Sequence, residues 1–233
     1  MLKNVLIGFI GFFMFSNSYC FGTFYSQCGQ DEFVYKSFFQ NLDKGVFVDI
    51  GAHSGIEISN TYFFEKELGW TGVCIEPIPQ LFEQLQQNRS CVCVQGCISD
   101  SSGSLPFIQF PYGKDWFSGL KDKFPAGHLE NLRDEWGFTS YEIIDVNCYL
   151  LSDILNQNQI NHINFLSLDT EGGELDILKS IDFSSVVIDV ITVEDNYNDP
   201  ELLEFLQSKN FDLVKRLYQD AIFARKGFNL SEQ

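Results

Sequence analysis

Short apolar runs recur along the chain and alternate with segments whose apolar residues are spaced three or four positions apart. The runs are rich in β-branched residues and are bounded by glycine or polar residues, which is typical of buried strands in a parallel sheet. The strands expected from this pattern lie at residues 45–50, 72–77, 91–98, 163–169 and 186–193, with a shorter one at 105–110.

The intervening segments have the periodicity of amphipathic helices that pack on a sheet. Two of them begin with proline, at Pro79 and Pro200, which suits the first position of a helix. Helices are expected at residues 33–42, 56–68, 79–88, 150–156, 175–181 and 200–208, and an antiparallel hairpin at 211–217 and 221–224. Alternating strands and helices with a final hairpin predict one α/β domain.

Residues 111–147 interrupt this alternation. The segment contains Trp116, Trp136 and several glycines, and it has no sustained helix or strand period. A stretch of this length is more typical of a functional loop than of a simple connection. We therefore expect an insertion that forms a lid or binds substrate.

The N-terminus differs from the rest of the chain. Lys3 precedes an unbroken apolar run at residues 5–15, and small residues lead up to Cys20. This pattern predicts that residues 1–20 are a cleaved signal peptide or a short anchor and that residues 21–233 form the domain. The expected location is the secretory pathway or a membrane, to which the N-terminus would target the chain transiently. An apolar N-terminal segment of a cytoplasmic protein is the alternative.

The amino-acid composition limits the classes of partner that the protein is expected to bind. The formal charge is −17, with 32 acidic and 15 basic residues, which argues against nucleic acid because phosphate binding needs a basic surface. The chain has seven cysteines, but their spacing is weak for zinc. If Cys20 leaves with a signal peptide, the remaining even number permits disulfides without demonstrating any.

The first predicted strand ends in a candidate cofactor loop. Asp49 is followed by Gly51 and Gly55, and glycines let the backbone approach a ligand closely. The spacing G-x-x-x-G departs from the G-x-G-x-x-G of dinucleotide sites. A carboxylate suits a cationic ligand such as S-adenosylmethionine better than a pyrophosphate. An ordinary tight turn is the alternative.

Acidic residues also follow the other predicted strands. Glu76 ends the second strand, where a carboxylate can accept hydrogen bonds from both ribose hydroxyls. Asp100 follows the third strand, where an adenine amino group could be held. Asp169 and Glu194 follow the fourth and fifth strands. Because the carboxyl ends of parallel strands meet at one edge of a sheet, these side chains are expected to gather there.

Five motifs occur in order along the chain: Ser26-Gln27-x-Gly29-Gln30-Asp31, Phe47-Val48-Asp49-Ile50-Gly51-Ala52-His53, Ser59-Asn60-Thr61, Gly72-x-x-x-Glu76-Pro77 and Asp169-Thr170-Glu171-Gly172-Gly173-Glu174. Together they resemble the FkbM family of S-adenosylmethionine-dependent methyltransferases. The resemblance covers nearly everything from Ser26 to Lys226. It implies a class I methyltransferase fold, which is Rossmann-like, with a mostly parallel seven-stranded sheet whose last strand is antiparallel. It also implies methylation of a hydroxyl oxygen, often on a sugar or polyketide.

The resemblance assigns roles to individual residues. Glu76 would bind the ribose, and Ser99 with Asp100 would bind the adenine. From the residues alone, Gln30 belongs to a solvated helix start, but its motif places it with the donor-binding residues. The methionine end of S-adenosylmethionine would be lined by Asp49, Gly51, His53 and Gly55.

Catalysis of O-methylation needs donor and acceptor held in line and a proton removed from a weakly acidic hydroxyl. Asp169 is the first candidate for the base or for orienting the acceptor, with Glu194 second and Glu174 in the same acidic group. Mutual repulsion among such carboxylates would raise a pKa toward values useful for a base. For Glu171 and Glu174, capping of the following helix is the alternative role.

A metal-dependent mechanism and a histidine as the catalytic base are alternatives. Asp169 with Asp195 and Asn196 resembles the ligand arrangement of magnesium-dependent O-methyltransferases, in which the cation lowers the pKa of the acceptor. The histidines His53, His128 and His162 are alternative bases, and His162, which precedes a strand, fits a structural role better.

Two other functional classes compete with a methyltransferase. Some membrane-anchored proteins resemble this family yet act in cargo trafficking, so a noncatalytic secretory-pathway module is the main alternative. Loss of donor-site residues would favour it, but Asp49, Gly51 and Glu76 are present. A nicotinamide-dependent oxidoreductase is disfavoured because the third glycine is missing and the chain ends in a hairpin.

Overall fold

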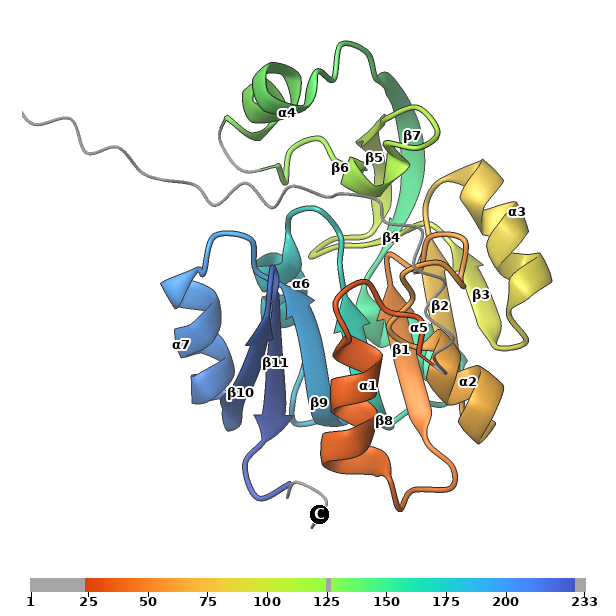
Figure 1. The fold of residues 1–233 in the computed structure, drawn as a ribbon, viewed down its shortest axis with the longest axis vertical. Coiled ribbons are helices and arrows are strands. Elements are labelled where there is room, and N and C mark those ends of the chain that lie inside the picture. Colours follow the sequence, from red (N-terminus) through yellow and green to blue (C-terminus); the bar gives the residue numbers. More distant parts are fainter. Residues whose placement is uncertain (1–23, 125–126, 229–233) are drawn as a thin grey trace, which may run out of the picture.

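The protein is built on a seven-stranded sheet covered by helices on both faces. The computed structural model describes residues 24–124 and 127–228. The strand order is β10-β11-β9-β8-β1-β2-β3, and β11 runs in the opposite direction to the other six strands (Figure 1). The fold class expected from the sequence is therefore confirmed. The strands are β1 (Val46–Ile50), β2 (Thr71–Glu76), β3 (Val92–Gln95), β8 (His162–Leu168), β9 (Val187–Glu194), β10 (Phe211–Leu217) and β11 (Asp220–Arg225).

Each face of the sheet buries its own apolar cluster. One cluster is rich in aromatic residues and joins the sheet to α1 (Gln30–Val34), to the π-helix η1 (Tyr35–Phe39) that continues it, and to α2 (Tyr62–Leu68). The other cluster is mainly aliphatic. It packs under α5 (Leu151–Gln157), α6 (Glu174–Ser180) and α7 (Pro200–Ser208), while α3 (Pro79–Asn88) packs on β2 and β3.

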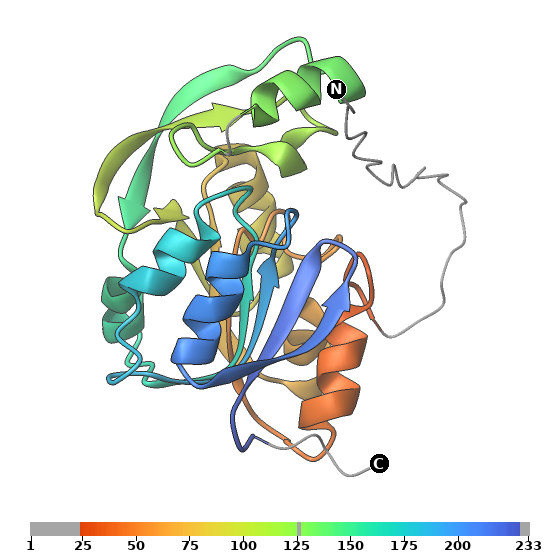
Figure 2. The same cartoon turned by 90° about the vertical axis from the view of Figure 1, so that its left-hand side faces the viewer.

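A second, four-stranded sheet lies beyond the carboxyl ends of the parallel strands (Figures 1 and 2). Its order is β4-β7-β5-β6, and it carries the 3-10 helix η2 (Asp115–Phe117) and α4 (His128–Trp136). The strands are β4 (Cys97–Ile98), β5 (Gly103–Gln109), β6 (Gly119–Leu120) and β7 (Glu142–Tyr149). The expected insertion at 111–147 therefore has regular structure and is placed over the ends of the main strands.

Two sequence expectations about elements are wrong. Residues 91–98 do not form one strand, because Gly96 has φ 146° and the chain passes there from the main sheet into the second sheet. The helix expected at 56–68 begins only at Tyr62, since Ile58 has φ 53° and bridges to Ser26. Ser59 Oγ then accepts the backbone N–H of Tyr62 at 3.1 Å.

The N-terminal expectation lies outside the described residues. Residues 1–20, expected to be a signal peptide or anchor, precede the first described residue. Within residues 24–124 and 127–228, no helix has the length and apolar character that crossing a membrane requires. The six cysteines of this part of the chain are free thiols.

Candidate active site

A first cavity opens where the parallel strands end beneath the second sheet. It encloses about 770 Å³, part of it open to solvent. Gly51, Glu76 and Asp169 line it from the ends of β1, β2 and β8, and Ile98 with Ser99 lines it from β4. Apolar walls with a few polar groups at one end are typical of small-molecule sites, and the carboxyl edge of an α/β sheet is where such ligands bind.

Glu76 is the acidic anchor of this cavity. Its two carboxyl oxygens accept the backbone N–H groups of His53 (2.9 Å) and Ile78 (2.8 Å). Burial raises the pKa of Glu76 to about 7, although these hydrogen bonds act in the opposite direction. A carboxylate has about four acceptor positions, so each oxygen retains a lone pair for a ligand hydroxyl.

His53 faces the same cavity in an unusual backbone conformation, with φ 51°. Its ring stacks on Trp116 at 5.2 Å and 5°, and its Nε2 lies 3.6 Å from Asp115 Oδ2. Burial lowers the pKa of His53. Both ring nitrogens are buried and lack a hydrogen-bond partner in the part of the chain that the structure describes. Asp115 and Trp116 belong to the insertion, and no local pattern in the sequence indicates their contacts with His53.

Both glycines of the loop lie close to other parts of the protein. A Cβ on Gly51 would lie 1.8 Å from the carbonyl oxygen of Asp169, and one on Gly55 would lie 2.6 Å from Leu85. Of the two glycines, only Gly51 lines the first cavity. The missing side chains of both glycines let β8 and α3 pack closely, which is a structural reason for glycine at these two positions.

Asp49 is also turned away from the cavity lining. It is 4% exposed and accepts a hydrogen bond from Thr61 Oγ1 at 2.6 Å. Arg89 lies 3.9 Å from its carboxylate, is itself 5% exposed and donates to the carbonyl of Gly55. The acid thus belongs to a buried ion pair behind the loop.

Replacing Gly51 by alanine is expected to destabilise the fold by about 3 kcal/mol. The left-handed conformation, φ 85°, costs an alanine about 1–2 kcal/mol, and the clash with Asp169 adds overpacking of about 1–3 kcal/mol. Urea unfolding measures the difference. Gly69→Ala is the matched control, since Gly69 has φ 65° and nothing within 4 Å of its would-be Cβ. Equal losses in both variants would contradict the close approach at Gly51.

The remaining predicted donor-site residues are not all brought together. Ser99 is buried and lines the first cavity. Asp100 is exposed and pairs with Lys123 at 3.0 Å outside that lining. Gln30 is buried, donates to the Asp220 carboxylate and accepts the N–H of Cys28 at 2.8 Å. Gln30 does not line the first cavity.

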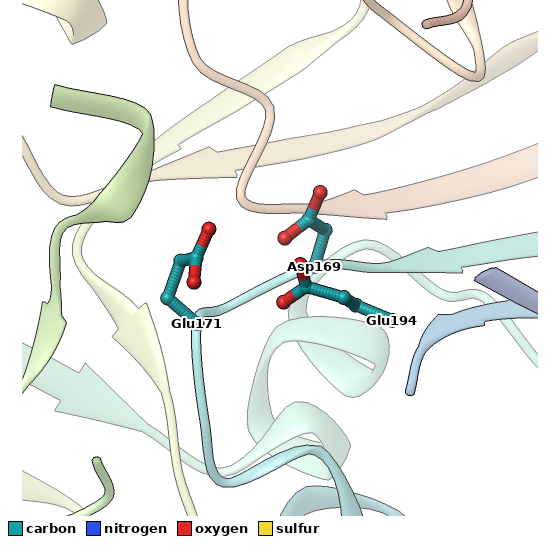
Figure 3. A group of neighbouring side chains, drawn as sticks. All are labelled: Asp169, Glu171 and Glu194. Atoms are coloured by element: carbon teal, nitrogen blue, oxygen red, sulfur yellow. The ribbon is translucent and has the colours of Figure 1, made fainter. Parts of the chain in front are cut away.

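Three carboxyl groups meet at the ends of β8 and β9. One oxygen of each of Asp169, Glu171 and Glu194 lies within 4.8 Å of the others, and Figure 3 shows the groups turned toward a common space. Burial, with repulsion from Asp220 and Glu174 next, raises the pKa of Asp169 to about 8. Burial and mutual repulsion also raise the pKa values of Glu171 and Glu194. Such a group holds shared protons near neutral pH.

Glu174 organises the loop that carries Glu171. Its Oε1 accepts the backbone N–H groups of Thr170 (3.0 Å) and Gly172 (3.1 Å) and the hydroxyl of Thr170 (2.7 Å). The loop needs this support because Glu171, Gly172 and Gly173 all have positive φ. Glu174 thus braces the loop that precedes α6 and does not cap the helix itself, whereas Glu171 faces the other acids.

A second cavity lies on the other side of the same loop. It encloses about 1160 Å³, part of it open to solvent, and reaches from the insertion to the segment after β9. Glu194 and His128 line the second cavity but not the first. The two cavities share four lining residues, Lys123, Glu171, Gly172 and Gly173. The acidic group therefore stands at the junction between two binding spaces.

The candidate metal ligand Asp195 and the candidate base His162 make contacts that hold the fold together. Both carboxyl oxygens of Asp195 are engaged, with the N–H of Asp199 (2.7 Å) and with Arg216 (2.7 Å). The described residues thus give no support to a magnesium site formed by Asp169, Asp195 and Asn196. His162 lies at the opposite end of β8 and pairs with Asp189 at 2.7 Å, which agrees with its expected structural role.

The sheet order and the cavity at the carboxyl ends of its strands are those of a class I methyltransferase fold. The chain belongs to the FkbM methyltransferase family, since the family model described as "Methyltransferase FkbM domain" matches residues 49–213. The family resemblance noted in the sequence is thereby confirmed.

Individual relatives are distant. "Methyltransferase sdnD" of Sordaria araneosa is 26% identical over 219 residues, covering 79% of this chain and 83% of that protein. Methyltransferase FkbM from Methylobacillus flagellatus KT is similar in structure with a TM-score of 0.48 and 12% identity, over 82% of this chain and 47% of that one. This chain thus spans about half of that protein. TrmK of M. capricolum, solved with S-adenosyl-homocysteine, has a TM-score of 0.41 and 10% identity, over 84% and 65% of the two chains.

Proposed function

We propose that the protein transfers a methyl group from S-adenosylmethionine in the first cavity to a hydroxyl group of an acceptor in the second. The observation that carries this proposal is the boundary that the two cavities share, where Glu171 lines both of them. A transferase must bring two ligands into contact in line. Two separate spaces that meet at one acidic group provide that arrangement.

The first cavity fits the donor. Glu76 has a free lone pair on each carboxyl oxygen for the ribose hydroxyls, and Nδ1 of His53 is buried without a hydrogen-bond partner among the described residues. Ile78, Ile98 and Phe107 supply apolar surface for an adenine ring. When bound, S-adenosylmethionine supplies an electrophilic methyl group on a sulfonium.

Asp169 would receive the proton of the acceptor hydroxyl. A base works best when its pKa lies near the working pH, and burial with neighbouring acids raises the pKa of Asp169 to about 8. Glu194 lies close enough to share that proton. The activity of the protein should then rise with pH through about 8, as the acidic group loses its proton.

The acceptor is proposed to be a sugar or glycan hydroxyl rather than a nucleic acid. The support is chemical: carboxylates and a histidine line the second cavity, and such groups exchange hydrogen bonds with hydroxyls. The net charge of −17 disfavours phosphate backbones. The expected N-terminal signal agrees with a glycan encountered in the secretory pathway.

Screening with methyl-labelled S-adenosylmethionine tests the proposed reaction. Neutral, amino and acidic saccharides would be incubated with the full chain, and products would be analysed for methyl ethers by mass spectrometry. A labelled methyl ether that requires the protein supports O-methylation. Label found only on nitrogen, carbon or RNA would contradict it.

The affinity for S-adenosylhomocysteine should rise about tenfold between pH 6 and pH 8. The pKa of Glu76 is about 7 in the free protein, and the ionised carboxylate is the form that accepts both ribose hydroxyls. At pH 6 the Glu76 carboxyl group is protonated in about nine tenths of the molecules and must lose its proton before the ligand binds. At pH 8 it is protonated in few of the molecules. Calorimetric titrations across this range measure the effect. The dependence should flatten in Glu76→Gln, and a persistent tenfold rise there would assign it to another group.

A further inference from the structure

The second cavity has an excess of acidic side chains over basic ones. Its described lining holds seven carboxyl side chains and one lysine. The amino group of Lys123 already binds Asp100 (3.0 Å) and Asp176 (2.6 Å), and Asp195 is paired with Arg216 outside the lining. Within residues 24–124 and 127–228, Glu171 and Glu194 form no ion pair with a basic side chain.

His128 gives an independent indication that this cavity receives a polar ligand. The residue is 9% exposed, and its ring stacks on Phe124 with centroids 5.0 Å apart. Its Nδ1 lies 3.4 Å from the Tyr197 hydroxyl. Nε2 is buried and has no hydrogen-bond partner among the described residues. Buried polar groups are nearly always hydrogen-bonded, so a ligand hydroxyl at Nε2 would complete the site.

We propose that the second cavity binds a polyhydroxylated ligand with a protonated amine, which lies against Glu171 and Glu194 while a hydroxyl meets His128. Assigning this ligand as the methyl acceptor rests on the proposed function. The acceptor would then be an amino sugar or a related amino polyol. Phosphorylated or carboxylated acceptors would be rejected, because their charge would face unpaired carboxylates.

The energetics favour a cation over a neutral ligand at this place. Asp169, Glu171 and Glu194 lie close together, and burial and mutual repulsion raise the pKa values of Glu171 and Glu194 and so favour their protonated forms. A positive group placed between Glu171 and Glu194 favours their ionised forms and replaces repulsion with attraction. A neutral hydroxyl offers hydrogen bonds but leaves the repulsion in place.

Three trisaccharides of graded charge test this inference with the full chain. Glucosamine trisaccharide is cationic, its N-acetylated form is neutral, and tri-galacturonate is anionic. We expect calorimetry in 0.15 M salt to show the cationic probe binding at least about tenfold more tightly than the neutral one, with no binding of the anionic probe. S-adenosylhomocysteine is titrated in parallel, so that the donor cavity is measured separately.

Variants assign the preference to the cavity. Glu171→Gln with Glu194→Gln should abolish the preference, and His128→Ala should weaken the binding of both the cationic and the neutral probe. Asp134→Asn is the matched control, since Asp134 is exposed on α4 and lies outside the lining. A thermal melt verifies that each variant is folded.

The outcomes separate this inference from the proposed function. Equal affinities for the three probes, or a cationic preference that survives the double glutamine variant, would overturn the inference even if S-adenosylhomocysteine binds. Failure of S-adenosylhomocysteine to bind would overturn the proposed methyl transfer, whatever the probes do. A cavity-dependent cationic preference together with donor binding supports both.

Discussion

Replacing Asp169 by asparagine is expected to lower kcat for methyl transfer by about 10²–10⁴-fold, the usual contribution of a general base. Asparagine keeps the size of the side chain but cannot take up the acceptor proton. Affinity for S-adenosylmethionine should change much less, because the proposed donor-binding residues Glu76 and His53 are untouched. Steady-state rates with an acceptor found by screening, combined with donor calorimetry, measure the two effects.

Asp145→Asn provides the control for the loss of one carboxylate. Asp145 is exposed on β7 and lines neither cavity, so its replacement should leave kcat unchanged. If Asp169→Asn also keeps its kcat, Asp169 is not the base. A large loss in Glu194→Gln alone would then move the role to the second acid of the group.

Replacing Arg89 by methionine is expected to cost about 3–5 kcal/mol of stability, the usual effect of removing one partner of a buried ion pair. Asp49 would be left 4% exposed with its charge uncompensated, and Thr61 and Gly55 would lose a donor. Urea unfolding at pH 7 measures the loss. The deficit should shrink toward pH 5, because burial raises the pKa of Asp49 and protonation removes the unpaired charge.

A second substitution distinguishes charge from packing. In Arg89→Met with Asp49→Asn, part of the lost stability should return, since the buried charge is gone. Arg133→Met is the surface control, because Arg133 is exposed and bound only to its neighbour Asp134 in the described structure, and it should unfold like the unmodified protein. An Arg89→Met protein as stable as the unmodified one would refute the role of this ion pair.

The parallel core could be predicted because its signals are local. The apolar runs that become β1 and β8, and Pro200 at the start of α7, determine their elements without reference to distant parts of the chain. The acids that end β2, β8 and β9 could be placed at one edge for the same reason. Parallel strands bring their carboxyl ends together whatever the loops do.

The insertion could not be predicted because its partners are remote in sequence. β7 pairs with β5 across about forty residues, and Ile143 near its start is exposed. Neither clear alternation nor a turn signal therefore marks this strand. His128, Asp115 and Trp116 gain their places only when this sheet folds over the main one.

The contacts of the buried charged residues also could not be predicted from the sequence. Arg89 follows a helix and has no local feature that sets it apart, since its partners come from β1 and α2. Glu171 and Glu174 are both candidates for a helix cap by position. Only the positive φ of residues 171–173 decides that Glu174 holds the loop while Glu171 faces the other acids.

Calorimetric titration of S-adenosylmethionine into the full chain, beside Glu76→Ala, tests the central claim most directly. The expected result is micromolar binding that weakens at least about tenfold without Glu76, the effect of losing hydrogen bonds to a charged group. Glu83→Ala, an exposed position on α3, should bind as the unmodified protein does. Absence of binding to the folded, unmodified chain, or full affinity in Glu76→Ala, would contradict the assignment of the first cavity as the donor site.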